Sequence, residues 1–468
     1  MGNFLMDQTK LCGTQSLHFQ RPAYILSAAS VAGKKEAGGP LGKKFDMVDE
    51  QDNLFGAKTW EEAESNMQKE ACILAIGKAG LKPEKIRYLF GGDLLRQGIA
   101  TSMGVEALQI PMFGLYGACS TSGEALALAA MSVSAGYGDS MLAVTSSHFG
   151  SAEKEFRFPL GYASQRPLSA HWTVTGSGAF VVGTDPGNVK ISGITVGKIV
   201  DYGLKDSQNM GACMAPAAAD TIVRNLKDFG RTAEDYDRII TGDLGSIGQS
   251  ILFDLAAEKG YDLRQKHLDC GMLIFDPETQ DTHAGGSGCG CAAVTLASYL
   301  LPKIESGEWK RILFVPTGAL MSTVSFNEGA SVPGIAHGDC DRTLSEGGGG
   351  MDYLISFLIG GVICALVQIL LDRTKLMPGR VMVCLVCGGV ILGFAGLYQP
   401  FQDFAKAGAS VPLLGFGNVL WKGVKEAVDK NGFIGIFMGG FKASAVGISA
   451  ALVFGYLASL IFDPKMKK

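Results

Sequence analysis

The sequence predicts an α/β protein built from two similar halves and followed by an all-α transmembrane domain. Strand-like and helix-like segments alternate from about residue 20 to about residue 340, a pattern typical of α/β folds. A segment that ends in Gly92-Asp93 has a counterpart that ends in Gly242-Asp243, which indicates an internal duplication. After residue 350 the sequence becomes strongly apolar, as expected for a membrane region.

The first half contains its strand and helix signals in a regular order. Apolar residues at helical spacing between residues 60 and 80 predict a helix, with Thr59 as its N-cap and Gly80 as its stop. In order, the expected elements are a strand at 23–30, a helix at 60–80, strands at 82–93 and 110–115, a helix at 125–135 and a strand at 141–148.

The second half repeats this order, and the two halves are expected to pack through parallel sheets. Ligands of such sheets bind beyond the carboxyl ends of the strands, so polar residues there are candidates for a pocket. These candidates are Asp93, His148, Asp243 and His283. Each also has a structural role open to it, because loop aspartates commonly cap turns and a lone histidine is commonly satisfied locally. The expected elements are a strand at 189–200, a helix at 217–229, a strand at 232–243, a Gly-rich turn at 284–291, a helix at 292–304 and a strand at 311–318.

Cys119 lies between the apolar run at 110–115 and the helix at 125–135. A cysteine at a sharp strand-to-helix turn has the geometry of a nucleophile, because the helix N-terminus favours a thiolate or a bound anion. A buried structural cysteine fits the same spacing. The residues alone leave both interpretations open.

Composition excludes several classes of function. The net charge is −4 and the sequence has no basic block, so nucleic acid is not an expected partner. The 11 cysteines lack paired spacings, which favours reduced thiols, and no metal site is expected. Cys289 and Cys291, for example, are too close in sequence for a zinc knuckle. Residues 1–21 lack the apolar core of a signal peptide, so the soluble part is expected not to be secreted.

The apolar C-terminal region divides the chain into three expected parts. They are a soluble domain at 1–344, a Gly-rich linker at 345–350 and a transmembrane domain at 351–468 with three or four membrane segments. Spans are expected at 353–371, 381–398 and 433–462, with an interfacial or re-entrant segment at 401–431. Lys442 lies in the last span, and a charge inside a membrane is costly, so it is a candidate for the membrane pathway. A helix break at the interface is the alternative for this lysine.

Four motifs support a resemblance to a known family. They are Tyr116-Gly-Ala-Cys-Ser-Thr-Ser-Gly-Glu-Ala125, Val144-Thr-Ser-Ser-His-Phe149, His171-Trp-Thr-Val-Thr-Gly-Ser-Gly178 and Gly285-Gly-Ser-Gly-Cys-Gly-Cys291. Together with the duplication, they resemble the thiolase and ketoacyl-synthase superfamily and, within it, the stage V sporulation protein AD family. The resemblance implies a five-layered thiolase-like fold, a homodimer and the binding of dipicolinic acid, a pyridine dicarboxylate stored with calcium in bacterial spores. Calcium is then expected only as part of the ligand, and no cofactor is implied. The residues expected to line the ligand site are Cys119, His148, Asp93, Asp243 and His283.

Working condensing enzymes of this superfamily pair the cysteine with His and Asn, or with two His and Cys. The matching strand end of this sequence reads Gly242-Asp-Leu-Gly245, and an aspartate beside Cys119 opposes ionisation of the thiol. The resemblance therefore implies a binding protein without catalytic activity. The alternative is a membrane-tethered acyl-transfer enzyme that uses Cys119 as its nucleophile.

The apolar region resembles the stage V sporulation protein AE family. The motifs that carry this resemblance are Met351-Asp-Tyr353, Leu371-Asp-Arg-Thr-Lys-Leu376 and Asp403-Phe-Ala-Lys-Ala-Gly-Ala409. It implies a multi-pass subunit of a channel or carrier in the inner membrane of the forespore and spore. Membrane lipid and other membrane proteins of this sporulation group are the expected partners. The whole chain is then expected to bind dipicolinic acid, as its calcium chelate, and to take part in its movement across that membrane during sporulation and germination.

Overall fold

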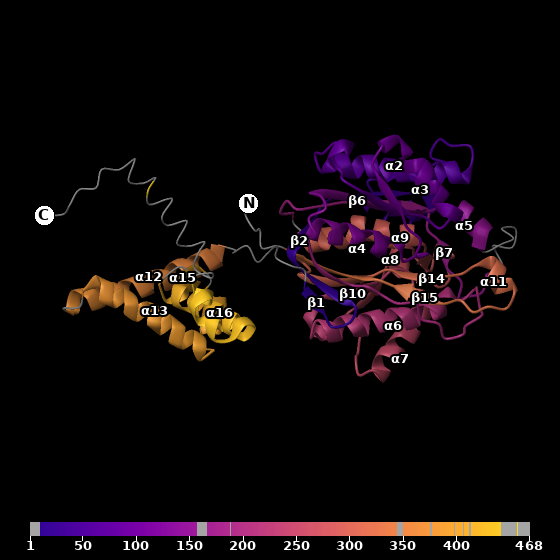
Figure 1. Ribbon diagram of the computed structural model, residues 1–468. Helices are drawn as coiled ribbons and strands as arrows, with labels where there is room; N and C mark the ends of the chain where they lie inside the picture. Colours follow the sequence, from indigo (N-terminus) through magenta and orange to yellow (C-terminus); the bar gives the residue numbers. More distant parts are fainter. Residues whose placement is uncertain are drawn as a thin grey trace. The chain divides into compact units, whose positions relative to one another are not determined.

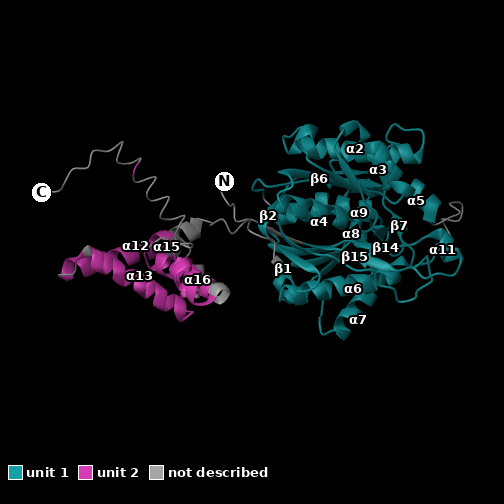
Figure 2. Cartoon of the chain, viewed as in Figure 1, with its two compact units in different colours: residues 1–344 teal, residues 345–468 magenta. Residues whose placement is uncertain are grey.

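The chain divides into two compact units, Met1–Leu344 and Ser345–Lys468 (Figure 2). The computed structural model describes residues 10–156, 166–187, 189–343, 350–374, 377–396, 398–405, 407–410, 413–440 and 456. The boundary between the units falls beside the Gly-rich stretch at 345–350.

Unit 1 contains the same strand pattern twice. In the first half, β4 (Leu89–Gly92) pairs in parallel with β5 (Met112–Gly114) and with β6 (Ser140–Ser147). β8 (Gly176–Gly183) is antiparallel to both of its neighbours, which are β6 and β2 (Ser16–Ala32). The order across this half of the sheet is β5-β4-β6-β8-β2. Numbered along the chain, these strands therefore lie in the order 3-2-4-5-1.

The second half has the same order, β11-β10-β13-β16-β9. β10 (Arg238–Thr241) is parallel to β11 (His267–Asp269) and to β13 (Arg311–Val315), whereas β16 (Gly338–Thr343) is antiparallel to β13 and to β9 (Val189–Thr195). Because β2 pairs with β9, the halves join in one sheet. The predicted duplication is confirmed, but the sheet is mixed rather than parallel, since the fifth strand of each half runs the other way.

Helices cover both faces of this arrangement and fill the space between the halves (Figure 1). One outer layer contains α2 (Trp60–Lys78) and α3 (Ile99–Val105), and the other contains α6 (Met210–Asp228) and α7 (Gly245–Glu258). The middle layer contains α4 (Thr121–Ser134), α8 (Cys270–Ile274) and α9 (Cys289–Thr295). The two halves of the sheet alternate with these three helical layers, so unit 1 has five layers. The predicted five-layered α/β fold is confirmed.

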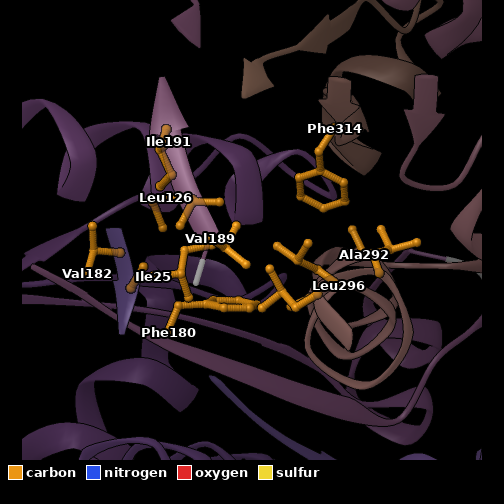
Figure 3. Close-up of a cluster of buried hydrophobic side chains, with 14 of the residues drawn as sticks. Ile25, Leu126, Phe180, Val182, Val189, Ile191, Ala292, Leu296 and Phe314 are labelled. Carbon is orange, nitrogen blue, oxygen red and sulfur yellow. The ribbon is translucent and has the colours of Figure 1, made fainter. Parts of the chain in front are cut away.

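A core of buried apolar side chains lies between the middle helices and the sheet (Figure 3). It includes Leu126 of α4, Phe180 of β8 and Phe314 of β13, each no more than 2% exposed. Burial of one large apolar side chain contributes roughly 1.5–3 kcal/mol. This core therefore fixes α4, and with it the turn that carries Cys119.

Local capping explains where two of these helices begin. α2 begins as predicted, because the Thr59 side chain accepts the backbone N–H of Glu62. α4 begins at Thr121, earlier than the sequence predicts. The Thr121 hydroxyl accepts from the Gly117 N–H and donates to the Ala118 carbonyl, so it closes a turn that the small-residue pattern does not reveal.

The remaining elements of unit 1 are short. The strands are β1 (Lys10–Cys12), β3 (Met47–Val48), β7 (Trp172–Thr173), β12 (Gly286–Ser287), β14 (Thr317–Ala319) and β15 (Gly334–Ala336). The helices are α1 (Lys34–Ala37), α5 (Phe149–Phe156), α10 (Leu301–Glu305) and α11 (Thr323–Asn327), with a π-helical turn at Leu296–Leu300. Short 3-10 helices lie at Gly42–Lys44, Pro83–Lys85, Arg96–Gly98, Glu106–Leu108 and Ala233–Asp235.

Unit 2 is helical over its described residues. Its helices are α12 (Gly350–Arg373), α13 (Pro378–Phe394), α14 (Tyr398–Ala405), α15 (Ala407–Ser410) and α16 (Leu413–Asn431), followed by a 3-10 turn at Gly432–Ile434. Among the described residues, one helix segment, Ser356–Arg373, is long and apolar enough to cross a membrane, and Gly379–Phe394 is a shorter apolar helix. α13 packs closely on α16, because Gly389 has no side chain to keep the two backbones apart. A Cβ at this position would collide with the Leu414 carbonyl oxygen. The number of membrane segments stays a prediction, since most of the span expected at 433–462 lies outside the described residues.

Candidate functional site

A cleft in unit 1 leads from the surface to Cys119. Its inner end is a cavity of ≈ 20 Å³ beside Cys119, which adjoins a compartment of ≈ 400 Å³ through Tyr116, Phe156 and Met321. This compartment shares Arg96 and Glu155 with a wider opening of ≈ 830 Å³. The three connected spaces are called the Cys119 cleft. Figure 1 shows α5 and α11, which contribute Glu155 and Thr323 to its walls, at the same end of unit 1.

Cys119 lies on a sharp turn immediately before α4. The preceding residue, Ala118, has a φ of +52°, a left-handed conformation that is uncommon for a residue with a Cβ. The Ser120 hydroxyl donates to the Gly117 carbonyl at 2.7 Å and helps to hold this turn. Cys119 is 6% exposed, and its sulfur lines the inner end of the cleft.

Asp243 forms a side-chain hydrogen bond with Cys119, and Ser287 contacts both side chains. The Ser287 hydroxyl is 3.7 Å from the Cys119 sulfur and donates to an Asp243 carboxylate oxygen at 2.8 Å. The same oxygen accepts the Gly288 N–H at 3.1 Å, and the other accepts the Thr317 hydroxyl at 2.7 Å. Burial raises the pKa of Asp243, although these hydrogen bonds oppose the shift. The site therefore places a buried acid, rather than an imidazole base, behind the thiol.

Asp93 follows β4, the strand of the first half that corresponds to β10. Its carboxylate accepts hydrogen bonds from the backbone of the loop that follows. One oxygen accepts the Leu95 N–H at 2.8 Å, and the other accepts the Thr101 N–H at 2.8 Å and the Thr101 hydroxyl at 2.6 Å. Burial raises the pKa of Asp93, and the hydrogen bonds from Thr101 oppose this. Asp93 does not line the cleft; it braces the loop between β4 and α3.

His148 also forms local hydrogen bonds outside the cleft. Its Nδ1 accepts the Gly150 N–H at 3.0 Å, so the proton is on Nε2, which donates to the Asn53 carbonyl at 2.9 Å. Burial lowers the pKa of His148, which favours this neutral form.

The other two candidates lie elsewhere in the chain. The Nδ1 of His283 is 2.8 Å from the Pro167 carbonyl oxygen, and its Nε2 is 3.1 Å from an Asp281 carboxylate oxygen. His283 does not line the Cys119 cleft. Lys442 lies outside the described residues. The structure thus brings Cys119 and Asp243 together, and the ligand-binding roles of Asp93, His148 and His283 stay predictions without a contact to the cleft.

Several residues of the cleft were not predicted. Ser287, which contacts Cys119 without lining the cleft, is the last residue of β12 in the Gly-rich motif, and its position shortly before α9 could have signalled it. Tyr116 is the first residue of the motif that contains Cys119, and it is 48% exposed. Arg96 and Glu155 form an ion pair with an N–O distance of 2.7 Å, and no sequence pattern connects them. Within the described residues, no group of three or more His, Cys, Asp or Glu side chains is arranged to hold a metal ion.

Comparison with known proteins decides the family of unit 1. Residues 13–339 match the family described as Stage V sporulation protein AD (SpoVAD). The chain belongs to this family. Stage V sporulation protein AD of Bacillus subtilis (strain 168) is 44% identical over 329 residues, which cover 70% of this chain and 97% of that protein. The thiolase-like fold implied by the sequence motifs is therefore the fold of unit 1. Among solved structures, 3-oxoacyl-[acyl-carrier-protein] synthase III from Aquifex aeolicus VF5 is 16% identical, with a TM-score of 0.44, over 68% of this chain and 99% of that chain.

Unit 2 matches a second sporulation family. Residues 352–461 match the SpoVAC/SpoVAEB sporulation membrane protein family. Stage V sporulation protein AC of Bacillus subtilis (strain 168) is 28% identical over 116 residues, which cover 23% of this chain and 76% of that protein. The predicted fusion of an AD-type domain with a sporulation membrane domain is confirmed, and the chain is a membrane protein.

Proposed function

We propose that unit 1 binds dipicolinic acid, as its calcium chelate, in the Cys119 cleft, and that the chain takes part in moving it across the inner spore membrane during sporulation and germination. One observation carries the proposal. The ≈ 400 Å³ compartment combines the aromatic rings of Tyr116 and Phe156 with the guanidinium of Arg96. An aromatic dicarboxylate needs such walls, because its ring packs on apolar surfaces and its carboxylates pair with arginine. Membership of two sporulation families supports the same function.

The ligand is placed in this compartment rather than against Cys119 itself. The space beside the sulfur is ≈ 20 Å³, about the room of one water molecule. A pyridine ring therefore rests between Tyr116 and Phe156, with its inner edge toward Cys119. Since Asp93 and Asp243 already accept internal hydrogen bonds, calcium arrives with the ligand and is not held beforehand by these residues.

Unit 1 is proposed to bind without catalysing acyl transfer. An acyl-transfer enzyme would need a base that ionises Cys119, and the group connected to this thiol is the carboxyl of Asp243. The alternative, a membrane-tethered acyl-transfer enzyme, is favoured only by the position of Cys119 at the start of α4. Incubation of the full chain with an acyl thioester separates the two: mass spectrometry should find no acyl group on Cys119.

Calorimetry of the detergent-solubilised full chain tests the binding function. Dipicolinate with calcium should bind, whereas the isomer pyridine-3,5-dicarboxylate should bind at least about tenfold more weakly, because its ring nitrogen cannot join the carboxylates in chelation. Cys119→Trp should abolish binding by filling the cleft, and Cys119→Ala, which leaves it open, should retain it. Equal binding of both isomers, or unchanged binding by a folded Cys119→Trp variant, would place the site elsewhere.

The proposed partners include a second copy of the chain, other membrane proteins of the sporulation group, and lipid. β5 is the last strand of the sheet, and Phe113 on it is 54% exposed. Phe113 stacks on Phe90 at a ring distance of 5.4 Å, which holds an apolar surface at the edge. Pairing of two such edges would cover both. A dimer mass by sedimentation, reduced to a monomer by Phe113→Lys, would support this arrangement.

A further inference from the structure

Arg96 and Glu155 face each other in the Cys119 cleft. Both line the ≈ 400 Å³ compartment and the wider opening. The Arg96 Nε donates to Glu155 Oε1 at 2.7 Å. The Glu155 side chain is 15% exposed and the Arg96 side chain is 65% exposed. The guanidinium can therefore reach the open part of the cleft, while the carboxylate stays against the wall.

The loop that carries Arg96 is held in place by the protein. Gln97 and Gly98 have left-handed φ values of +58° and +61°, and this conformation is uncommon for a residue with a side chain. Asp93 accepts the N–H of Leu95 on one side of the turn and that of Thr101 on the other. This explains why a buried aspartate lies beside the cleft without lining it. It fixes the position from which Arg96 extends.

Charges around the opening are balanced when no ligand is present. The lining carries two cationic side chains, Arg96 and Lys154, and two carboxylates, Glu61 and Glu155. A lining without net charge attracts an anion only weakly. If Arg96 leaves Glu155, however, the anion can form a charge-assisted hydrogen bond with the guanidinium. The pair is open to solvent on the Arg96 side, so a carboxylate of the ligand can approach the guanidinium there, and leaving the largely buried Glu155 carboxylate unpaired costs part of the energy gained.

We infer that Glu155 is an internal competitor for the ligand, and that a dicarboxylate binds by an exchange of partners at Arg96. The guanidinium leaves the Glu155 carboxylate and pairs with a carboxylate of the ligand, and no covalent bond changes. This inference rests on the proposed function. The Arg96–Glu155 pair then selects anionic ligands over neutral ones, because a neutral aromatic diamide of the same shape cannot replace the Glu155 carboxylate at Arg96.

Calorimetric titration of the detergent-solubilised full chain with dipicolinate, with and without calcium, tests the exchange. Glu155→Gln should bind about threefold to tenfold more tightly than the wild type, because the competing charge is gone. Glu106→Gln is the matched control, since it removes an exposed carboxylate that does not line the cleft, and its affinity should stay within about twofold. Arg96→Gln should bind about tenfold more weakly, and Arg96→Lys should lose less.

The double variant Arg96→Gln with Glu155→Gln completes a cycle. The gain from Glu155→Gln should vanish in this background, because the arginine that benefits is absent. Unchanged or weaker binding by Glu155→Gln, with normal binding by the wild type, would overturn the exchange and leave the proposed function standing. An equal gain from Glu106→Gln would also overturn it, in favour of a general charge effect. If neither the wild type nor Glu155→Gln binds dipicolinate, both the exchange and the proposed function are overturned.

Discussion

Asp243→Asn tests how strongly the buried carboxyl keeps Cys119 in its thiol form. The Ser287 hydroxyl lies 2.8 Å from the carboxylate and 3.7 Å from the sulfur. The Cys119 thiol also forms a side-chain hydrogen bond with Asp243, so a thiolate would form about 4 Å from the carboxylate, and Coulomb's law with an effective dielectric constant of about 20 gives roughly 4 kcal/mol of repulsion. That energy corresponds to roughly a thousandfold in the rate of a reaction that requires the thiolate.

The amide of this variant should fit the site. Thr317 donates through a hydroxyl group, which can also accept, so the new NH₂ can face Thr317 while the amide oxygen keeps the Gly288 N–H. The assay is the rate of iodoacetamide alkylation of the Cys119 peptide, followed by mass spectrometry in the full chain. The variant should react up to about a thousandfold faster at pH 8. Since burial raises the pKa of Asp243, the difference should shrink as the pH falls and the wild-type carboxyl takes up a proton. An unchanged rate at pH 8 in a folded variant would refute the reasoning.

Three other predictions concern packing, protonation and the membrane pathway. Gly290→Ala should destabilise unit 1 by about 1–3 kcal/mol, because its Cβ would collide with the Gly176 carbonyl oxygen. Gly77→Ala is the control, and it should be neutral or stabilising because a Cβ there would meet nothing within 4 Å. Chemical denaturation compares the free energies of unfolding of the two variants. Burial raises the pKa of Glu36 from 4.5 to about 7, so its contribution to stability is complete below pH 4.5 and is lost as the pH rises through about 7. Glu36→Gln should therefore raise the unfolding temperature at pH 8 and leave it unchanged at pH 4, and an equal shift at both would contradict this. Lys442→Leu should ease membrane insertion by roughly 2.5–3.5 kcal/mol at mid-membrane depth but reduce dipicolinate accumulation in spores, and normal accumulation would leave Lys442 as an anchor.

The duplicated fold could be predicted because both halves place Gly-Asp at the end of a buried strand, at Asp93 and Asp243. The antiparallel strand β8 could not be predicted from the sequence. Its residues are largely glycine, serine and alanine, since a side chain at Gly178 would meet the backbone of Ala293 in α9. Close packing of a helix thus keeps β-branched residues out of the first half of the strand, and Val181 and Val182 are too short a run to predict a strand by themselves.

The site was predictable to the extent that it depends on strand ends. Cys119 and Asp243 meet because the carboxyl ends of strands from both halves face the middle of the unit. Asp93 lies at an equivalent end, but there the following loop needs a carboxylate to bind its N–H groups. Arg96 and Glu155 are exposed or half-buried charged residues far apart in sequence, and only the folded chain shows that they pair.

The two units belong to one polypeptide, and this determines how they are supplied to a membrane. Stage V sporulation protein AD of Bacillus subtilis is matched over 97% of its length by 70% of this chain, so unit 2 has no counterpart in that relative. Separate subunits depend on their concentrations to associate, whereas two units of one polypeptide keep an effective concentration that does not fall on dilution. Every copy that is translated therefore delivers both units in equal number. Dilution of the protein in a growing membrane would separate independent subunits, but it leaves this pair together.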